Sequence, residues 1–132
     1  MSTLDLLLKI DRTKVVRPTK KVELPRLSAL AGEAVIFTLQ ALTYEEQEEI
    51  SEISASDGEI DQGAIRAHTV IKGLLDPSLK SSELLKHQGV ATPKELLLQT
   101  NFLLPGELFQ LYSEISDLSG FGEDAVTEVK NG

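Results

Sequence analysis

The two histidines, His68 and His87, are the side chains in this sequence best suited to acid–base or metal chemistry. His68 falls among apolar positions at helical spacing, which favours a packed or partly exposed histidine over a metal ligand. His87 lies just before Gly89 at an expected helix end, where a cation suits the helix dipole. No serine or acid accompanies either histidine in a recognisable nucleophile motif. We therefore expect no catalytic residues and no enzymatic activity.

Carboxylates are densest between residues 45 and 52, where five glutamates could in principle collect a cation. Carboxylates at helical spacing usually form the solvated face of a helix, and we favour that interpretation. The chain has no cysteine, no G-x-x-x-x-G-K-[ST] run and no G-x-G-x-x-G run. The sequence therefore predicts neither a bound metal nor a cofactor.

A strand-turn-strand pattern begins the ordered part of the chain. Residues 20–24 and 34–42 are typical of strands, and residues 31–33 supply a turn between them. Thr43 and Glu46 stand three apart and form a capping-box pattern, so an acidic helix is expected over 44–53. A small β element therefore leads directly into helices.

Helix signals dominate the rest of the chain. Asp61 is an expected N-cap for a helix to residue 75, and a short helix follows from about residue 81 to Gly89. Thr92 and Pro93 begin a helix expected to end near residue 103, and Pro105 begins the last one, ended by glycines at 120 and 122. Residues 3–10 could form one more short helix.

These signals predict an α+β fold, with a small antiparallel β-hairpin or sheet near the N-terminus followed by a mainly α-helical bundle. A length of 132 residues indicates a single domain. Within it we expect an N-terminal arm (1–17), a β element (18–42), a helical body (43–122) and a flexible tail (123–132).

The net charge of −8 is unevenly distributed. Residues 1–26 hold seven basic and three acidic side chains, a net +4, so the remaining 106 residues carry −12. A basic segment can bind an acidic partner or nucleic acid, or it can lie over the acidic body of its own chain. No aromatic residue precedes Phe37 to stack on bases, which makes nucleic acid the less favoured partner.

Apolar side chains between residues 93 and 118 cover more than one helical face. They fit either a helix buried on two sides or a groove that accepts an amphipathic partner helix. The candidate partner-binding residues here are Leu97, Phe102, Phe109 and Tyr112. Leu4, Leu7 and Leu8 form a short apolar face near the N-terminus, which either docks on its own domain or mediates self-association.

Several segments together resemble the XkdN-like tail assembly chaperones of tailed phages and prophages. They are the leucine-rich start at residues 4–9, the strand-turn-strand segments 22–27 and 32–39, residues 40–46, and the helical remainder ending at Gly120, Phe121 and Gly122. The resemblance spans nearly the whole chain. It implies a non-enzymatic protein that binds the tape-measure protein, a long helical polypeptide that sets tail length, and keeps it soluble during tail morphogenesis.

Two other functions stay open at this point: a structural component of the tail or baseplate, and a small nucleic-acid-binding regulator that uses the basic N-terminal arm. The longest apolar runs are far too short to span a bilayer, and the first residues lack the features of a signal peptide. We therefore expect no membrane association and a location in the cytoplasm of the bacterial host.

Overall fold

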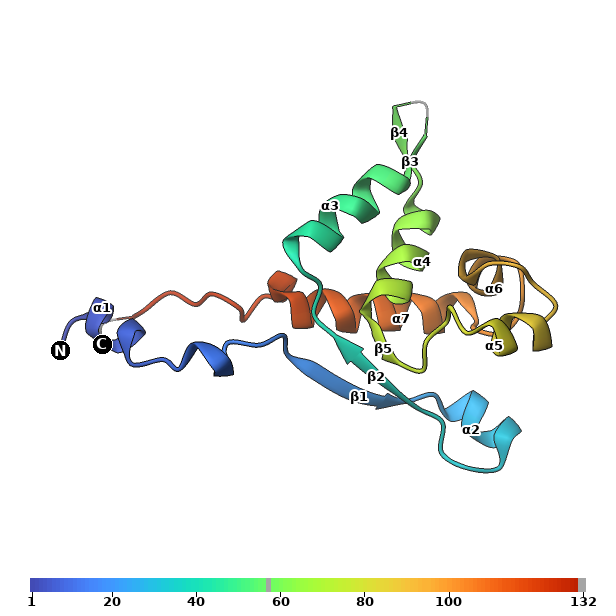
Figure 1. The fold of residues 1–132 in the computed structure, drawn as a ribbon, viewed down its shortest axis with the longest axis horizontal. Coiled ribbons are helices and arrows are strands. Elements are labelled where there is room, and N and C mark those ends of the chain that lie inside the picture. The colour runs from blue at the N-terminus through green and yellow to red at the C-terminus, as the bar shows by residue number, and fades with distance from the viewer. Residues whose placement is uncertain (57, 131–132) are drawn as a thin grey trace.

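The computed structural model describes residues 1–56 and 58–130 and has the expected α+β fold (Figure 1). Three antiparallel strands form the main sheet in the order β1-β2-β5, and helices pack mostly against one face of it. The helices and strands are α1 (Thr3–Leu8), β1 (Thr19–Glu23), α2 (Pro25–Ala31), β2 (Ile36–Gln40), α3 (Tyr44–Ile53), β3 (Ala55–Ser56), β4 (Glu59–Ile60), α4 (Gln62–Gly73), β5 (Leu74–Asp76), α5 (Ser82–His87), α6 (Pro93–Leu98) and α7 (Pro105–Ser116).

Helix α2 replaces the simple turn expected between the first two strands. Pro25 occupies its first turn, where the fixed φ of proline suits a helix and the missing N–H is not needed. Gly32 ends the helix with a φ of 79°, a conformation that favours glycine. The connection therefore carries a helix of seven residues, and β2 begins at Ile36 rather than residue 34.

Strand β5 is absent from the sequence-based prediction, because Leu74 and Leu75 continue the apolar spacing of α4. In the structure α4 ends at Gly73, and Leu74 pairs with Leu39 of β2. A separate two-stranded antiparallel sheet, β3–β4, lies between α3 and α4, where no strand is expected from the sequence. The chain thus gains a third strand in its main sheet by ending α4 two residues early.

Helix α6 is shorter than expected and ends at Leu98 instead of near residue 103. The Thr100 hydroxyl donates to the Leu96 carbonyl at 2.6 Å and accepts from the Phe102 N–H at 3.1 Å. A threonine side chain that bonds neighbouring backbone groups competes with the helical ladder. The expected N-caps of α3, α4 and α6 are confirmed: Thr43, Asp61 and Thr92 each accept a backbone N–H.

The core lies between the sheet and the crossing helices α4 and α7. Phe37 and Leu39 of β2 point into it, and Ile115 of α7 is fully buried. Gly73 allows the closest approach of the two helices, since a Cβ built there would lie 2.6 Å from two Ile115 side-chain carbons. One continuous apolar cluster therefore joins the main sheet to α4, α5, α6 and α7.

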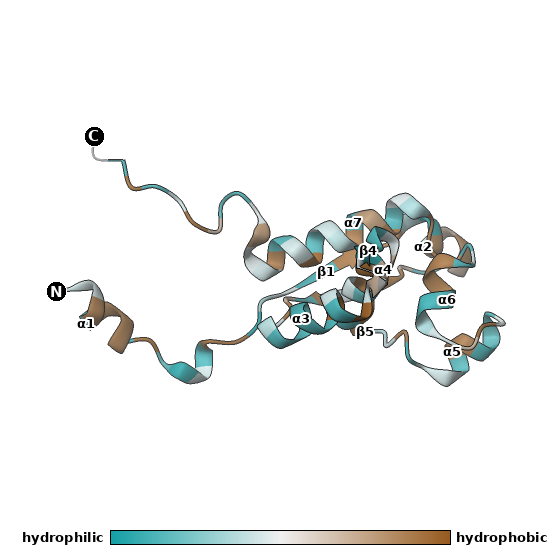
Figure 2. Ribbon diagram, turned by 90° about the horizontal axis from the view of Figure 1, so that it is seen from above, coloured by the Kyte–Doolittle hydropathy of each residue, from teal (hydrophilic) through white to brown (hydrophobic). Residues whose placement is uncertain are grey.

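Both terminal segments extend from the same side of the body (Figures 1 and 2). Every residue from 1 to 21 is exposed, including all of α1 and the 3-10 turn η1 (Arg12–Lys14). The arm is tied to the body at Arg17, which donates to the Ala41 carbonyl at 3.3 Å and pairs with Glu46 at 2.8 Å. Within the described residues, no helix has the length and apolar character needed to cross a membrane.

Strand β1 forms one edge of the main sheet, since β2 is its partner on one side only. It carries adjacent lysines, Lys20 and Lys21, and Pro25 follows it at the start of α2. Lys20 forms an ion pair with Glu114 of α7. Charged side chains thus dominate this edge.

Candidate functional site

The structure separates the predicted partner-binding residues from one another. Leu97 is 4% exposed and belongs to the core, so it supports the fold of α6. Phe102 is partly buried and lines a groove beside α2 and α5. Phe109 and Tyr112 lie one turn apart on α7, with Phe109 half exposed. Of these four residues, only Phe109 and Tyr112 form a common surface, while the predicted residues Leu4, Leu7 and Leu8 all lie exposed on α1.

Phe109 and Tyr112 form an aromatic pair whose ring centroids are 6.3 Å apart at an interplanar angle of 38°. The Arg66 guanidinium of α4 lies 5.6 Å from the centroid of the Phe109 ring, within cation–π distance. The arginine therefore holds one exposed ring in place, and the ring keeps an outward face for a further contact.

Two further aromatic residues continue this surface along the end of α7. A depression of about 340 Å³ is lined by Ile65, Tyr112 and Phe121, and a second of the same size is lined by Tyr44 and Phe121. Gln47 of α3 lines both. We call this continuous surface the aromatic groove, defined by Tyr44, Phe109, Tyr112 and Phe121. It contains four of the six aromatic residues in the chain.

Local hydrogen bonds fix the two walls of the aromatic groove. The Ser119 hydroxyl accepts from the Leu42 N–H at 2.8 Å and donates to the Ile115 carbonyl at 2.7 Å. This links the end of α7 to the segment that leads into α3. Gly120, with a φ of 91°, then reverses the chain so that Phe121 faces the start of α3. Tyr44 and Phe121 remain 89% and 69% exposed.

Helix α3, whose Tyr44 and Gln47 line the aromatic groove, also carries exposed acidic side chains. Glu45, Glu48 and Glu52 recur at helical spacing on this helix, while Glu49 pairs with Lys72 of α4 at 2.6 Å. The expected solvated acidic face is therefore present.

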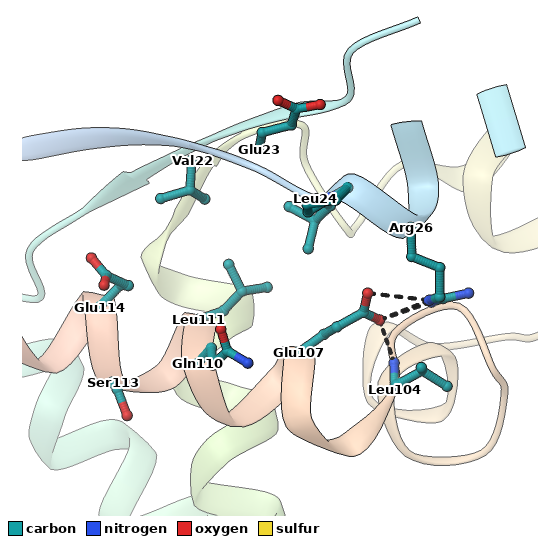
Figure 3. A pocket seen from close by; sticks show the side chains of 11 residues that line it. Val22, Glu23, Leu24, Arg26, Leu104, Glu107, Gln110, Leu111, Ser113 and Glu114 are labelled. Atoms are coloured by element: carbon teal, nitrogen blue, oxygen red, sulfur yellow. Dashed lines mark hydrogen bonds and ion pairs between the residues drawn. The ribbon is translucent and has the colours of Figure 1, made fainter. Parts of the chain in front are cut away.

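A second groove, of about 580 Å³, lies between β1 and α7 (Figure 3). Val22, Leu24 and Leu111 give it an apolar floor, and an ion pair between Arg26 and Glu107 crosses one end. The Arg26 side chain donates to both Glu107 oxygens, with a shortest contact of 2.8 Å, and to the Phe102 carbonyl at 2.8 Å. This pair ties α2 to the start of α7.

Hydrogen bonding from Arg26 lowers the pKa of the Glu107 carboxyl below its usual range, and the Leu104 N–H, at 2.7 Å, acts in the same direction. The pKa of Arg26 is raised by the same partner. A carboxyl whose pKa is lower in the folded protein stabilises the fold above the ordinary glutamate pKa. That contribution is lost as the pH falls through the lowered value.

We therefore expect Glu107→Gln to reduce the free energy of unfolding by about 1 kcal/mol at neutral pH, because a partly exposed charged pair is lost. The difference from wild type should shrink to near zero as the pH falls below the Glu107 pKa, since wild-type Glu107 is then also uncharged. Urea unfolding followed by circular dichroism at several pH values measures this. A difference that stays constant down to low pH would contradict the assigned role of the ion pair.

The histidines lie apart in the structure, and His68 has the partly exposed position that its spacing predicts. It lies on α4, where burial, followed by the charges of Lys94 and Lys72, lowers its pKa. His87 lies in the last turn of α5. Over residues 1–56 and 58–130, no three histidine or carboxylate side chains gather as a metal site would need.

The basic N-terminal segment is divided between body and arm. Arg17, Lys20 and Arg26 each form an ion pair with an acidic residue of the body, as expected if the segment lies over that body. Lys9, Arg12 and Lys14 lie on the projecting arm instead. Some basic side chains of the segment thus form ion pairs with the body, and the others give the arm an exposed positive charge.

Comparison with known proteins decides the family. The phage XkdN-like tail assembly chaperone protein family, TAC, matches residues 4–130. The chain belongs to this family. The resemblance seen in the sequence is thereby confirmed, and the match includes both the aromatic groove and the projecting arm of this tail assembly chaperone.

A solved structure supports the fold of the chaperone independently. The crystal structure of the protein YqbN superposes with a TM-score of 0.58 at 21% sequence identity, covering 79% of this chain and 87% of that one. At this identity the similarity shows a shared fold alone. None of the curated proteins matches the chain.

The candidate residues chosen from the sequence include Phe109 and Tyr112 of the aromatic groove, but not Tyr44, Phe121 or Arg66. In the sequence Tyr44 is only the first residue of the expected acidic helix, and Phe121 is only part of the glycine-rich end of the last helix. The only signal in the sequence is its composition. The chain has six aromatic residues, so a cluster of several of them on the surface indicates a function. That argument becomes specific only once the fold brings α3 and the end of α7 together.

Proposed function

We propose that this tail assembly chaperone binds the phage tape-measure protein in the host cytoplasm and keeps it soluble until the tail tube forms around it. The chaperone acts by covering apolar surface and performs no catalysis. Membership of the tail assembly chaperone family supports the role, and the exposed aromatic groove is the observation that supports the mode of binding.

The aromatic groove suits a partner helix for physical reasons. Aromatic side chains bury a large area with few rotatable bonds, and they are enriched among residues that contribute most to protein interfaces. Phe109 and Tyr112 lie one turn apart on α7, so a helix laid along α7 can contact both. A partner whose apolar stripe is covered in this way no longer self-associates through that stripe.

Co-expression with the cognate tape-measure protein tests this proposal. Wild-type chaperone should raise the soluble fraction of the tape-measure protein and co-purify with it. Single variants Tyr44→Ala, Phe109→Ala and Phe121→Ala should each weaken binding by about tenfold or more, as expected for interface aromatic residues. Ile60→Ala, an exposed apolar residue on β4, provides the matched control and should bind like wild type.

The results separate the binding surface from the function itself. If a variant that combines Tyr44→Ala, Phe109→Ala and Phe121→Ala binds as tightly as wild type, the groove assignment is rejected. If wild-type chaperone neither binds nor solubilises the tape-measure protein, the function is rejected. A structural tail component would be retained in purified particles, whereas a chaperone should be absent from them.

A further inference from the structure

Helix α1 and the aromatic groove are two exposed apolar surfaces on the same chain. Leu4, Leu7 and Leu8 share one face of α1, and all three are more than half exposed. The Ser2 hydroxyl and the Asp5 carboxylate cap the helix, each accepting a backbone N–H at 3.1 Å, yet none of its residues is buried. The leucine face and the exposed rings of the groove would each gain stability from being covered.

A helix of six residues is marginal in water without a partner, because so few hydrogen bonds do not offset the cost of nucleation. A surface that receives the leucine face would therefore stabilise α1. Figure 2 shows α1 as a hydrophobic segment near the end of the arm, with the hydrophilic turn η1 between it and the body. The arm thus has the layout of a docking helix on a polar tether.

The arm leaves the body at the edge of the aromatic groove. Arg17 contacts the Ala41 carbonyl and Glu46, and the Ala41 N–H donates to the Pro18 carbonyl at 3.0 Å. Residues 42–44, which lie between Ala41 and Glu46 in the chain, line the groove. Both ribbon views show the arm departing beside the start of α3 and the end of α7 (Figures 1 and 2). The groove is thus next to the point where the arm is attached.

The tether is long enough for α1 to fold back onto this groove. Residues 9–16 separate α1 from Arg17, and a segment of that length spans at most ~26 Å when extended. Tyr44 precedes Glu46 by two positions on α3, so the near end of the groove is only about one helical turn, ~5 Å, from the anchor. A short flexible tether gives an effective concentration on the order of millimolar. At micromolar protein concentrations α1 therefore meets the groove of its own chain first.

Charge favours the same contact. Residues 1–17 carry four basic and two acidic side chains, a net +2. Helix α3, which lines one side of the groove, exposes Glu45, Glu48 and Glu52. Asp117 lines the groove at the end of α7. Folding the arm back thus brings a positive tether toward negative side chains, an attraction that salt screens because these charges are exposed.

We propose that α1 is a lid, which packs its leucine face against the aromatic groove of its own chain and leaves when a partner helix binds there. The structure shows the open arrangement, in which both surfaces are uncovered. The lid contact needs no partner, but its competition with a partner helix rests on the proposed function. While no partner is bound, the closed lid keeps unrelated apolar segments off the rings, and it lowers the apparent affinity for any helix by the open fraction.

Intrinsic fluorescence tests the lid directly, because both tyrosines, Tyr44 and Tyr112, line the groove and the chain has no tryptophan. Acrylamide quenching of the full chain at low micromolar concentration measures the solvent access of these rings. The arm variant Leu4→Asp/Leu7→Asp should raise the quenching constant by about 1.5-fold or more, since the shielded population is lost. Leu30→Asp, the same substitution at an exposed leucine on α2, is the matched control and should be quenched like wild type.

An engineered disulfide gives a second readout that reports position, since the natural chain has no cysteine. With glutathione disulfide as oxidant, Leu7→Cys/Tyr44→Cys should form an intramolecular disulfide several-fold faster than Leu7→Cys/Ile60→Cys. Ile60 is also exposed, and it lies just beyond the ten residues of α3, a helix ~15 Å long, so an undocked arm would reach it as well. The ratio of the two rates therefore measures docking rather than reach.

Three results would overturn the proposal: equal quenching of wild type and the arm variant, equal rates of disulfide formation in the two cysteine pairs, or shielding of the tyrosines that disappears when wild type is diluted tenfold. The last would show that another molecule covers the rings. Binding of the tape-measure protein, measured in parallel, is decided separately. A chaperone that binds this partner while its tyrosines stay fully open would retain the proposed function and lose only the lid.

Discussion

Leu97→Ala is expected to destabilise the protein by about 2–5 kcal/mol, because it removes buried methyl groups and leaves a cavity. Leu97 is 4% exposed and packs in the core with Leu96 of the same helix. For a domain of this size each kcal/mol lowers the melting temperature by roughly 3–6 °C. A loss of roughly 6–30 °C in differential scanning calorimetry is therefore the expected result.

Leu98→Ala is the matched control for this substitution. Leu98 follows directly in α6, has the same side chain and is 41% exposed. Its replacement should cost below about 1 kcal/mol, as is usual for surface positions. Equal destabilisation by the two variants would contradict the orientation of α6. Because Leu97 supports the fold, a substitution at this position would mask any effect on partner binding.

Gly73→Ala is expected to cost about 1–3 kcal/mol through overpacking. The new Cβ would lie 2.6 Å from two carbons of Ile115, and Ile115 is fully buried and cannot move aside freely. At an exposed position of a helix, the same substitution would raise the free energy of unfolding, because alanine favours a helix more than glycine does. Chemical unfolding of the variant measures the effect.

A double-mutant cycle with Ile115→Val sharpens this prediction. Ile115→Val alone should cost about 0.5–1.5 kcal/mol by removing one buried methyl group. In the double variant the methyl group introduced by Gly73→Ala occupies part of that space, so the total cost should be smaller than the sum of the two single costs. Strict additivity would show that residues 73 and 115 do not pack directly against each other.

Local signals predict much of the fold because they act within one turn of chain. The capping residues Thr43, Asp61 and Thr92 each bond a backbone N–H three positions later, and such short-range chemistry is readable without tertiary information. The positive φ of Gly89 and Gly120 likewise follows from the freedom of glycine at helix ends. Both the α+β class and the order of the main helices follow from these signals.

Tertiary packing decides the features that sequence reasoning misses. Leu74 and Leu75 fit a helix or a strand equally well, and only the partner strand β2 selects β5. The α2 segment can form a turn or a short helix by its local sequence. The ion pair that anchors it joins Arg26 to Glu107, which lies 81 positions later in the chain. The aromatic groove depends on the same kind of long-range contact, through Ser119 and Leu42.

The lysine-bearing edge of β1 has a consequence for how the protein avoids aggregation. An unguarded sheet edge can recruit further strands and start ordered aggregation. Lys20 and Lys21, with Pro25 just beyond, place charge and a missing N–H donor along that edge. These features protect the chaperone itself from becoming a template for amyloid-like growth.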